Sequence, residues 1–153
     1  MMYYTHIAGG VVCGTLAYTV MPTGGPISFI GGAIMGSLVP DLDHPGAILN
    51  RRAGFSSPLV AFGHRTFTHS FLFALIVLGI VMLGGLNISF NLGLFVGMLS
   101  HLLLDALNPS GVPLFWPYKH RYNIARLRTG QGGDFVVLFV CAALMYFYFK
   151  MKI

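Results

Sequence analysis

Long apolar runs, separated by short groups of proline, glycine and charged residues, dominate the chain. The pattern predicts five helices, at residues 6–21, 27–39, 67–84, 91–107 and 134–150. At 1.5 Å per residue the second helix is only about 20 Å long, against a hydrocarbon core of about 30 Å, so the first two helices are short and the second is a candidate re-entrant segment. The pattern therefore predicts an all-α, multi-pass membrane bundle of four to five helices, in a single membrane-embedded domain over residues 1–153.

Composition supports a membrane location. The chain is 56% hydrophobic and 8% charged, which excludes an ordinary soluble globule. The first apolar run has no Lys or Arg before it and no small-residue cleavage site after it, so we interpret it as a mature helix rather than a secretory signal.

Charge is distributed unevenly between the two predicted membrane faces. Alternating helices place the N-terminus and the loops 40–66 and 108–133 on one face, which then holds seven of the nine basic residues. These are Arg51, Arg52, Arg65, Lys119, Arg121, Arg126 and Arg128. The positive-inside rule predicts that this face is cytoplasmic. Basic loops of this kind suit anionic lipid headgroups, and no helix-turn-helix, zinc-finger or RNA-binding signature indicates a nucleic acid partner.

Acidic residues are few and lie close to histidines. All four are aspartates, and Asp41, Asp43 and Asp105 each lie within four positions of a histidine. An ionisable group in apolar helix costs roughly 2.5–3.5 kcal/mol at mid-membrane, so such groups need a compensating partner, and a metal cation is the simplest one. The same alternation of helices places eight candidate ligands at one membrane face. They are His6, Asp41, Asp43, His44, His64, His69, His101 and Asp105.

Two of the motifs have informative spacing. His101 and Asp105 are four residues apart, so they share one face of a helix and can share a metal, although such a pair is also a common helix-surface hydrogen bond. In PDLDHP, two prolines end the helix and project two carboxylates and an imidazole, unless these are solvated capping residues. This donor set suits one or two divalent ions, with Zn²⁺ as the first choice and Mn²⁺ or Fe²⁺ as alternatives.

A third motif, GHRTFTHS, lies where the third helix begins and contributes His64, Arg65 and His69. Arg65 has two possible catalytic roles, either pairing with Asp43 or holding a substrate phosphate. A bound metal would lower the pKa of water toward ~7 and provide a nucleophile. Asp43 is the candidate general base that takes the proton.

These motifs resemble the YdjM-type family of bacterial inner-membrane proteins, described as membrane-bound metal-dependent hydrolases. The resemblance runs from His6 through PDLDHP, GHRTFTHS and SHLLLDALNPSGVPLFWP to about Arg128. More distantly, the order of the motifs is similar to the ligand order of zinc-dependent phospholipase C and its nuclease relatives. That similarity implies ligand roles for His6, Asp41, His69, His101 and Asp105. The chain departs from it by having no HxxxE element after Asp105, which puts a full three-metal site in doubt.

The sequence thus predicts a membrane-bound metal-dependent hydrolase at the cytoplasmic face of the inner membrane. Its expected substrate is an ester, foremost a phosphoester of a phospholipid or a lipid-linked molecule. A metal-ion or proton transporter is an alternative, because intramembrane His and Asp are typical of transporters too, and a non-catalytic membrane adaptor is another. An intramembrane metalloprotease would need HExxH, and the chain has no glutamate.

Overall fold

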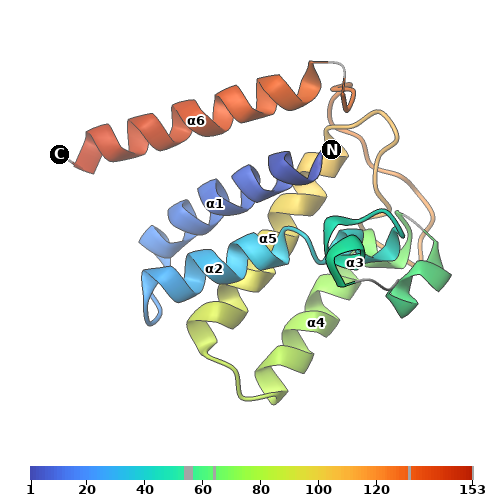
Figure 1. The fold of residues 1–153 in the computed structure, drawn as a ribbon, viewed down its shortest axis with the longest axis horizontal. Helices are drawn as coiled ribbons and strands as arrows, with labels where there is room; N and C mark the ends of the chain where they lie inside the picture. Colours follow the sequence, from blue (N-terminus) through green and yellow to red (C-terminus); the bar gives the residue numbers. More distant parts are fainter. Residues whose placement is uncertain (54–56, 64, 131, 153) are drawn as a thin grey trace.

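The computed structural model describes residues 1–53, 57–63, 65–130 and 132–152, and these fold into helices joined by loops. Within them, an antiparallel bridge between Val112 and Tyr122 is the only β pairing. In chain order (Figure 1), the elements are α1 (Tyr3–Val20), α2 (Pro26–Gly36), the 3₁₀ turn η1 (Pro40–Asp43), α3 (Ile48–Ala53), η2 (Pro58–Phe62), η3 (Phe67–His69), α4 (Phe71–Leu83), α5 (Ile88–Ala106) and α6 (Gly133–Lys152). The prediction of an all-α fold is confirmed.

Each of the five predicted helices is present, with boundaries that differ by a few residues. The largest difference is at the start of α4, which begins at Phe71 rather than at residue 67. The preceding residues form η3, and the Ser70 hydroxyl then caps α4 by accepting a hydrogen bond from the Phe73 N–H. Because a serine cap satisfies one of the first unpaired N–H groups, it fixes where the helix begins.

Helix α3 was not predicted. It has six residues and lies in the connection between α2 and α4, between η1 and η2 along the chain (Figure 1). A helix of that length is too short to show hydrophobic periodicity, so its sequence resembles the surrounding loop.

The centre of the fold is α5, which packs against α1, α2 and α4. Its approach to α2 is the closest, and glycines on both helices permit it. A Cβ atom at Gly97 would lie 2.0 Å from the carbonyl oxygen of Ala33, and one at Gly93 would lie 1.9 Å from that of Phe29. Small residues at such crossings let the two backbones meet, as in membrane helix pairs.

Gly97→Ala is therefore expected to destabilise the fold by about 1–3 kcal/mol, because the added methyl group must push α5 away from α2. The matched control is Gly31→Ala, where a Cβ has no described heavy atom within 4 Å beyond its own helix and chain neighbours. Alanine favours helix over glycine by about 1 kcal/mol, so this control should melt at the same or a higher temperature. Thermal unfolding in detergent measures both, and equal losses in the two variants would contradict the packing described here.

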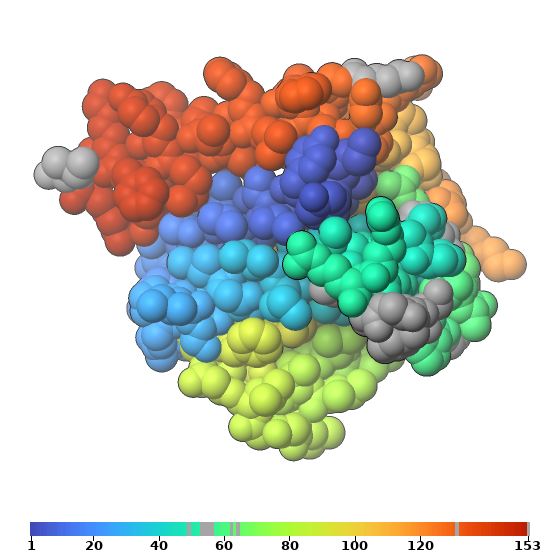
Figure 2. Space-filling view, in the orientation of Figure 1, coloured from blue at the N-terminus to red at the C-terminus, as the bar shows by residue number. Residues whose placement is uncertain are grey.

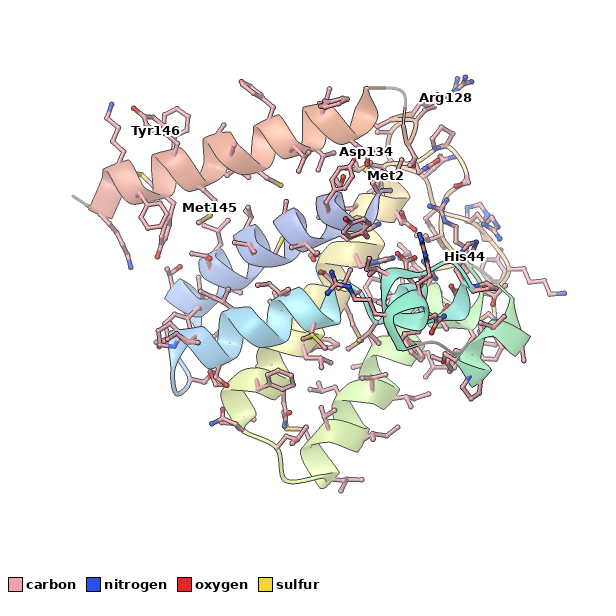
Figure 3. The ribbon with its side chains drawn as sticks, in the orientation of Figure 1. Met2, His44, Arg128, Asp134, Met145 and Tyr146 are labelled. Carbon is pink, nitrogen blue, oxygen red and sulfur yellow. The ribbon has the colours of Figure 1, made fainter. Side chains whose placement is uncertain are left out.

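Helix α6 lies along α1, on the opposite side of the molecule from α4 (Figure 2). Its first turn is anchored by the buried Asp134 (Figure 3), whose carboxylate accepts hydrogen bonds from the N–H of Met2 (3.0 Å), the hydroxyl of Thr5 (2.8 Å) and the N–H of Gly130 (2.7 Å). Asp134 therefore joins the starts of α1 and α6.

Among the described residues, two helices are long and apolar enough to cross a membrane, α5 and α6. They differ in environment, since 61% of the apolar window of α5 is buried inside the protein and only 11% of that of α6. Helix α4 is also apolar but shorter. That four or five helices cross the membrane stays a prediction.

Candidate metal centre

Five side chains meet at the end of the bundle where α1 and α4 begin and where α2 and α5 end. They are His6 of α1, Asp41 of η1, His69 of η3, and His101 and Asp105 of α5. They form two overlapping groups that could hold a metal ion, His6–Asp41–His101 and His69–His101–Asp105, and within each group the donor atoms lie within 4.8 Å of one another. Four of the five residues are buried, and Asp41 is partly exposed.

The hydrogen bonds of His101 show which ring nitrogen faces the cluster. Its Nδ1 lies 2.7 Å from the carbonyl oxygen of Ser37. Because a carbonyl can only accept, Nδ1 carries the proton and the Nε2 lone pair is left for a cation. This Nε2 lies 3.6 Å from Asp41 Oδ1 and 3.8 Å from Asp105 Oδ2.

His69 is oriented in the same way by a carboxylate. Its Nδ1 lies 3.2 Å from Asp43 Oδ2, and its Nε2 lies 3.4 Å from Asp105 Oδ2 and 3.3 Å from the Nε2 of His101. Burial alone would lower the pKa of His69, but hydrogen bonds with Asp105 and Asp43 outweigh burial and raise it. Two imidazole lone pairs at 3.3 Å repel each other, so a proton or a metal ion is needed between them.

His6 is the clearest indication that the donor set fits a metal. Its ring stacks on that of His101, with centroids 3.8 Å apart and an angle of 13° between the planes. It is fully buried, yet among the described residues neither ring nitrogen has a hydrogen-bond partner. A buried polar atom without a partner is uncommon and costs free energy, and coordination to a cation removes that cost.

Asp43 lies behind His69, on the side away from His101. Its Oδ2 also accepts hydrogen bonds from the backbone N–H of Arg65 (3.0 Å) and from the hydroxyl of Thr68. The side chain is fully buried. This is the position of a carboxylate that orients a ligating histidine, an arrangement common at metal sites. A role for Asp43 as general base stays a prediction.

Arg65 contacts the cluster from the loop before η3. Its Nη2 lies 3.0 Å from Asp105 Oδ1, and its Nη1 donates to the Ser110 hydroxyl. The backbone of Arg65 has a φ of 58°, a conformation rare for residues other than glycine, which allows its N–H to reach Asp43 while its guanidinium reaches Asp105. Among the described residues, the guanidinium of Arg65 forms an ion pair with Asp105, and its contact with Asp43 is through the backbone N–H.

Three predicted ligands, Asp43, His44 and His64, are not part of these groups. His44 is exposed and its Nδ1 accepts a hydrogen bond from the N–H of Gly46 (3.0 Å). His64 lies outside the described residues. Ligand roles for Asp43, His44 and His64 stay predictions.

A pocket of about 330 Å³ borders the cluster at Asp41. Its lining comes from the start of α1 and from the segment η1–α3, and Figure 3 shows Met2 and His44 in these two parts. Asp41 has a side-chain exposure of 23%, against 1% or less for His6, His69, His101 and Asp105. It is therefore the predicted ligand through which the cluster faces the pocket.

Three contributors to the site were not predicted from the sequence. The Ser37 carbonyl orients His101, the N-terminal amine of Met1 lies 2.8 Å from Asp105 Oδ1, and Arg51 lines the pocket. A backbone carbonyl or amine has no residue-type signal, so Ser37 and Met1 were not detectable. Arg51 carried only its charge as a signal, which was assigned to the membrane surface.

Comparisons with known proteins agree with the sequence motifs. The model of a family described as YdjM inner membrane protein matches residues 1–152. The chain is 36% identical over 151 residues to "Inner membrane protein YdjM" of Escherichia coli K12, covering 91% of this chain and 76% of that protein. It is 35% identical over 150 residues to "Uncharacterized protein YvsG" of Bacillus subtilis 168, covering 94% and 92%. No solved structure matches. This chain therefore belongs to the YdjM family of inner membrane proteins.

Proposed function

We propose that the protein is a metal-dependent hydrolase of the cytoplasmic membrane that cleaves a phosphoester in a phospholipid or a lipid-linked molecule. The observation that carries the proposal is the cluster of buried His and Asp donors that reaches a pocket through the partly exposed Asp41. A buried cluster without a pocket would suit a structural metal, whereas an accessible one suits catalysis.

The donor set favours a transition-series ion. Imidazole nitrogens and carboxylate oxygens suit Zn²⁺ best, with Mn²⁺ and Fe²⁺ as alternatives, and no cysteine is among the donors. Both groups use His101, but its Nε2 has a single lone pair and can bind one ion only. A second ion would therefore depend on His6 and on a carboxylate shared with the first.

The chain's residues have separate tasks in this proposal. A divalent ion bound here would supply Lewis-acid chemistry, which polarises the ester and lowers the pKa of water toward ~7. Asp41 borders the pocket and would hold the ion where a substrate can reach it. Asp43 holds His69 in its ligating orientation, and Arg65 balances the charge of Asp105. The buried surroundings of His6, His69 and His101 exclude bulk water from the donor atoms.

Location supports a lipid substrate. The cluster lies at one end of the helices, the end that the basic loops also occupy, so a membrane spanned by α5 and α6 would place the pocket near headgroup depth. By the positive-inside rule this end faces the cytoplasm. Anionic lipids are then the expected surroundings.

Polar residues at the opposite end of α5 have structural partners, which favours hydrolysis over transport. Asn87 caps α5, the Ser89 hydroxyl donates to the Gly25 carbonyl, and the Asn91 amide donates to the carbonyls of Val81 and Leu86. These contacts hold the connections between helices. A transport path would instead use polar groups that continue from the cluster to the far side.

The test is hydrolysis by the purified protein in vesicles of mixed phospholipids, with release of phosphate and of water-soluble headgroups as the readout. We expect turnover that stops when a chelator removes the metal and returns with Zn²⁺, Mn²⁺ or Fe²⁺. His101→Ala should be inactive, and His120→Ala, which changes an exposed histidine of the 108–133 loop, should be active. Turnover that persists in the chelated protein, or in His101→Ala, would contradict the proposal.

A further inference from the structure

We propose that Arg51, with His44, forms a subsite for the phosphoryl group of the substrate or product in the pocket beside Asp41. The inference rests on the proposed function and adds to it the residues that recognise the anion. It starts from the shape of the pocket. Residues from the start of α1 form one wall and the segment from η1 to α3 forms the other, so a molecule in the pocket lies against the one partly exposed carboxylate of the cluster.

The charges lining the pocket suit an anion held beside a metal. Among the described lining residues, Asp41 is the only carboxylate and Arg51 is the only cationic side chain. If Asp41 binds the metal, its charge is neutralised and the pocket becomes positive overall. A phosphate in the pocket would then meet a cation at Asp41 and the guanidinium of Arg51, both from the segment η1–α3. Arginine is suited to this position because its planar group can donate two parallel hydrogen bonds to a phosphate.

Arg65 is less suited to this task, although it lies near the same cluster. Its guanidinium is engaged by Asp105 Oδ1 at 3.0 Å and by the Ser110 hydroxyl, and it is not among the residues that line the pocket. Moving it to a substrate would leave the buried carboxylate of Asp105 without this partner, which is unfavourable. The structure therefore gives the anion-binding role to Arg51.

His44 adds a hydrogen-bond donor of defined tautomer. Its Nδ1 accepts the N–H of Gly46 at 3.0 Å, so in the neutral ring the proton is on Nε2. An imidazole Nε2–H can donate to a phosphate oxygen without adding a charge. His44 is thus better placed as a contact of the bound anion than as a ligand of a metal in the buried cluster.

The experiment compares Arg51→Gln with Arg52→Gln. Both residues are exposed, adjacent in α3 and equally charged, but only Arg51 lines the pocket. Titration calorimetry on the detergent-purified, Zn²⁺-loaded full chain measures binding of inorganic phosphate at constant ionic strength. Metal content is measured on each sample. We expect Arg51→Gln to weaken phosphate binding about tenfold, the size of one charge-assisted hydrogen bond at a partly solvated site, and Arg52→Gln to leave it within about twofold.

A second titration with a soluble short-chain phosphatidic acid distinguishes a lipid phosphate from free phosphate. Tighter binding of the lipid than of inorganic phosphate, with the same dependence on Arg51, would support a lipid phosphoryl group. Tighter binding of inorganic phosphate would support capture of the free ion in the same subsite. Equal weakening of phosphate binding in the two arginine variants would overturn the subsite. So would metal-loaded wild type that binds neither probe. Neither result would contradict the metal site. Wild type that holds no metal would overturn the proposed function itself.

Discussion

Replacing Asp105 with asparagine is expected to weaken metal binding by more than 100-fold, which would abolish it at ordinary concentrations. Asp105 Oδ1 lies 3.6 Å from His6 Nε2 and Oδ2 lies 3.4 Å from His69 Nε2, so one carboxylate connects ligands from two helices and a turn. Its charge also neutralises Arg65 at 3.0 Å. An amide keeps the shape of the side chain but offers neither the negative charge nor a second acceptor atom.

The same substitution should lower the free energy of unfolding by about 3 kcal/mol, because it leaves a largely buried guanidinium beside a neutral group. Asp134→Asn is the matched control, since it removes another buried aspartate from the same end of the fold. Competition with a chromophoric chelator measures metal affinity, and thermal unfolding measures stability. Asp134→Asn should lose stability and keep the metal. Retention of metal by Asp105→Asn at wild-type affinity would contradict the assignment.

Asp43→Asn has the second largest expected effect, a loss of metal affinity of about 10- to 100-fold. The carboxylate fixes the ring of His69 through Nδ1 at 3.2 Å, and it accepts the hydroxyl of Thr68 and the N–H of Arg65. An asparagine amide at this position can keep two of these hydrogen bonds. It carries no negative charge, however, and so cannot compensate positive charge on the His69 ring. We therefore expect the His69 ring to be less firmly oriented and less basic.

Measuring metal affinity and turnover together separates the two roles considered for Asp43. If Asp43 positions His69, Asp43→Asn lowers the affinity for metal, and its turnover recovers in part at saturating metal. A general base would leave affinity unchanged and remove turnover at any metal concentration. Thr68→Val, which removes one hydrogen bond to Asp43 and keeps the side-chain shape, should give a smaller loss of affinity in the same direction. Unchanged affinity in Asp43→Asn would refute the positioning role.

The helices and the five clustered donors were predictable because their signals are local. Apolar runs marked the five long helices, and a polar residue at the end of an apolar run stands out in the sequence. His6, Asp41, His69, His101 and Asp105 all lie at such ends, and alternation of helices was enough to place them at one end of the bundle.

Which partner each polar residue contacts was not predictable from the sequence. It depends on 3₁₀ turns and on one residue with positive φ, and the sequence signal for both is weak. A single residue separates Asp41 from Asp43, yet η1 turns the first toward His101 and the second behind His69. The backbone at Arg65 similarly decides that its guanidinium reaches Asp105. The proposed role of Arg51 required the pocket, because α3 had no periodic pattern to reveal it.

The central claim is that this cluster binds a divalent transition metal. The most direct test is the metal content of the detergent-purified protein, measured by mass spectrometry before and after chelation and reconstitution. We predict one or two equivalents of zinc, manganese or iron per chain, removed by the chelator, restored by the matching ion and absent from His101→Ala. Folded wild-type protein that retains no metal after reconstitution with each of the three ions would contradict the account.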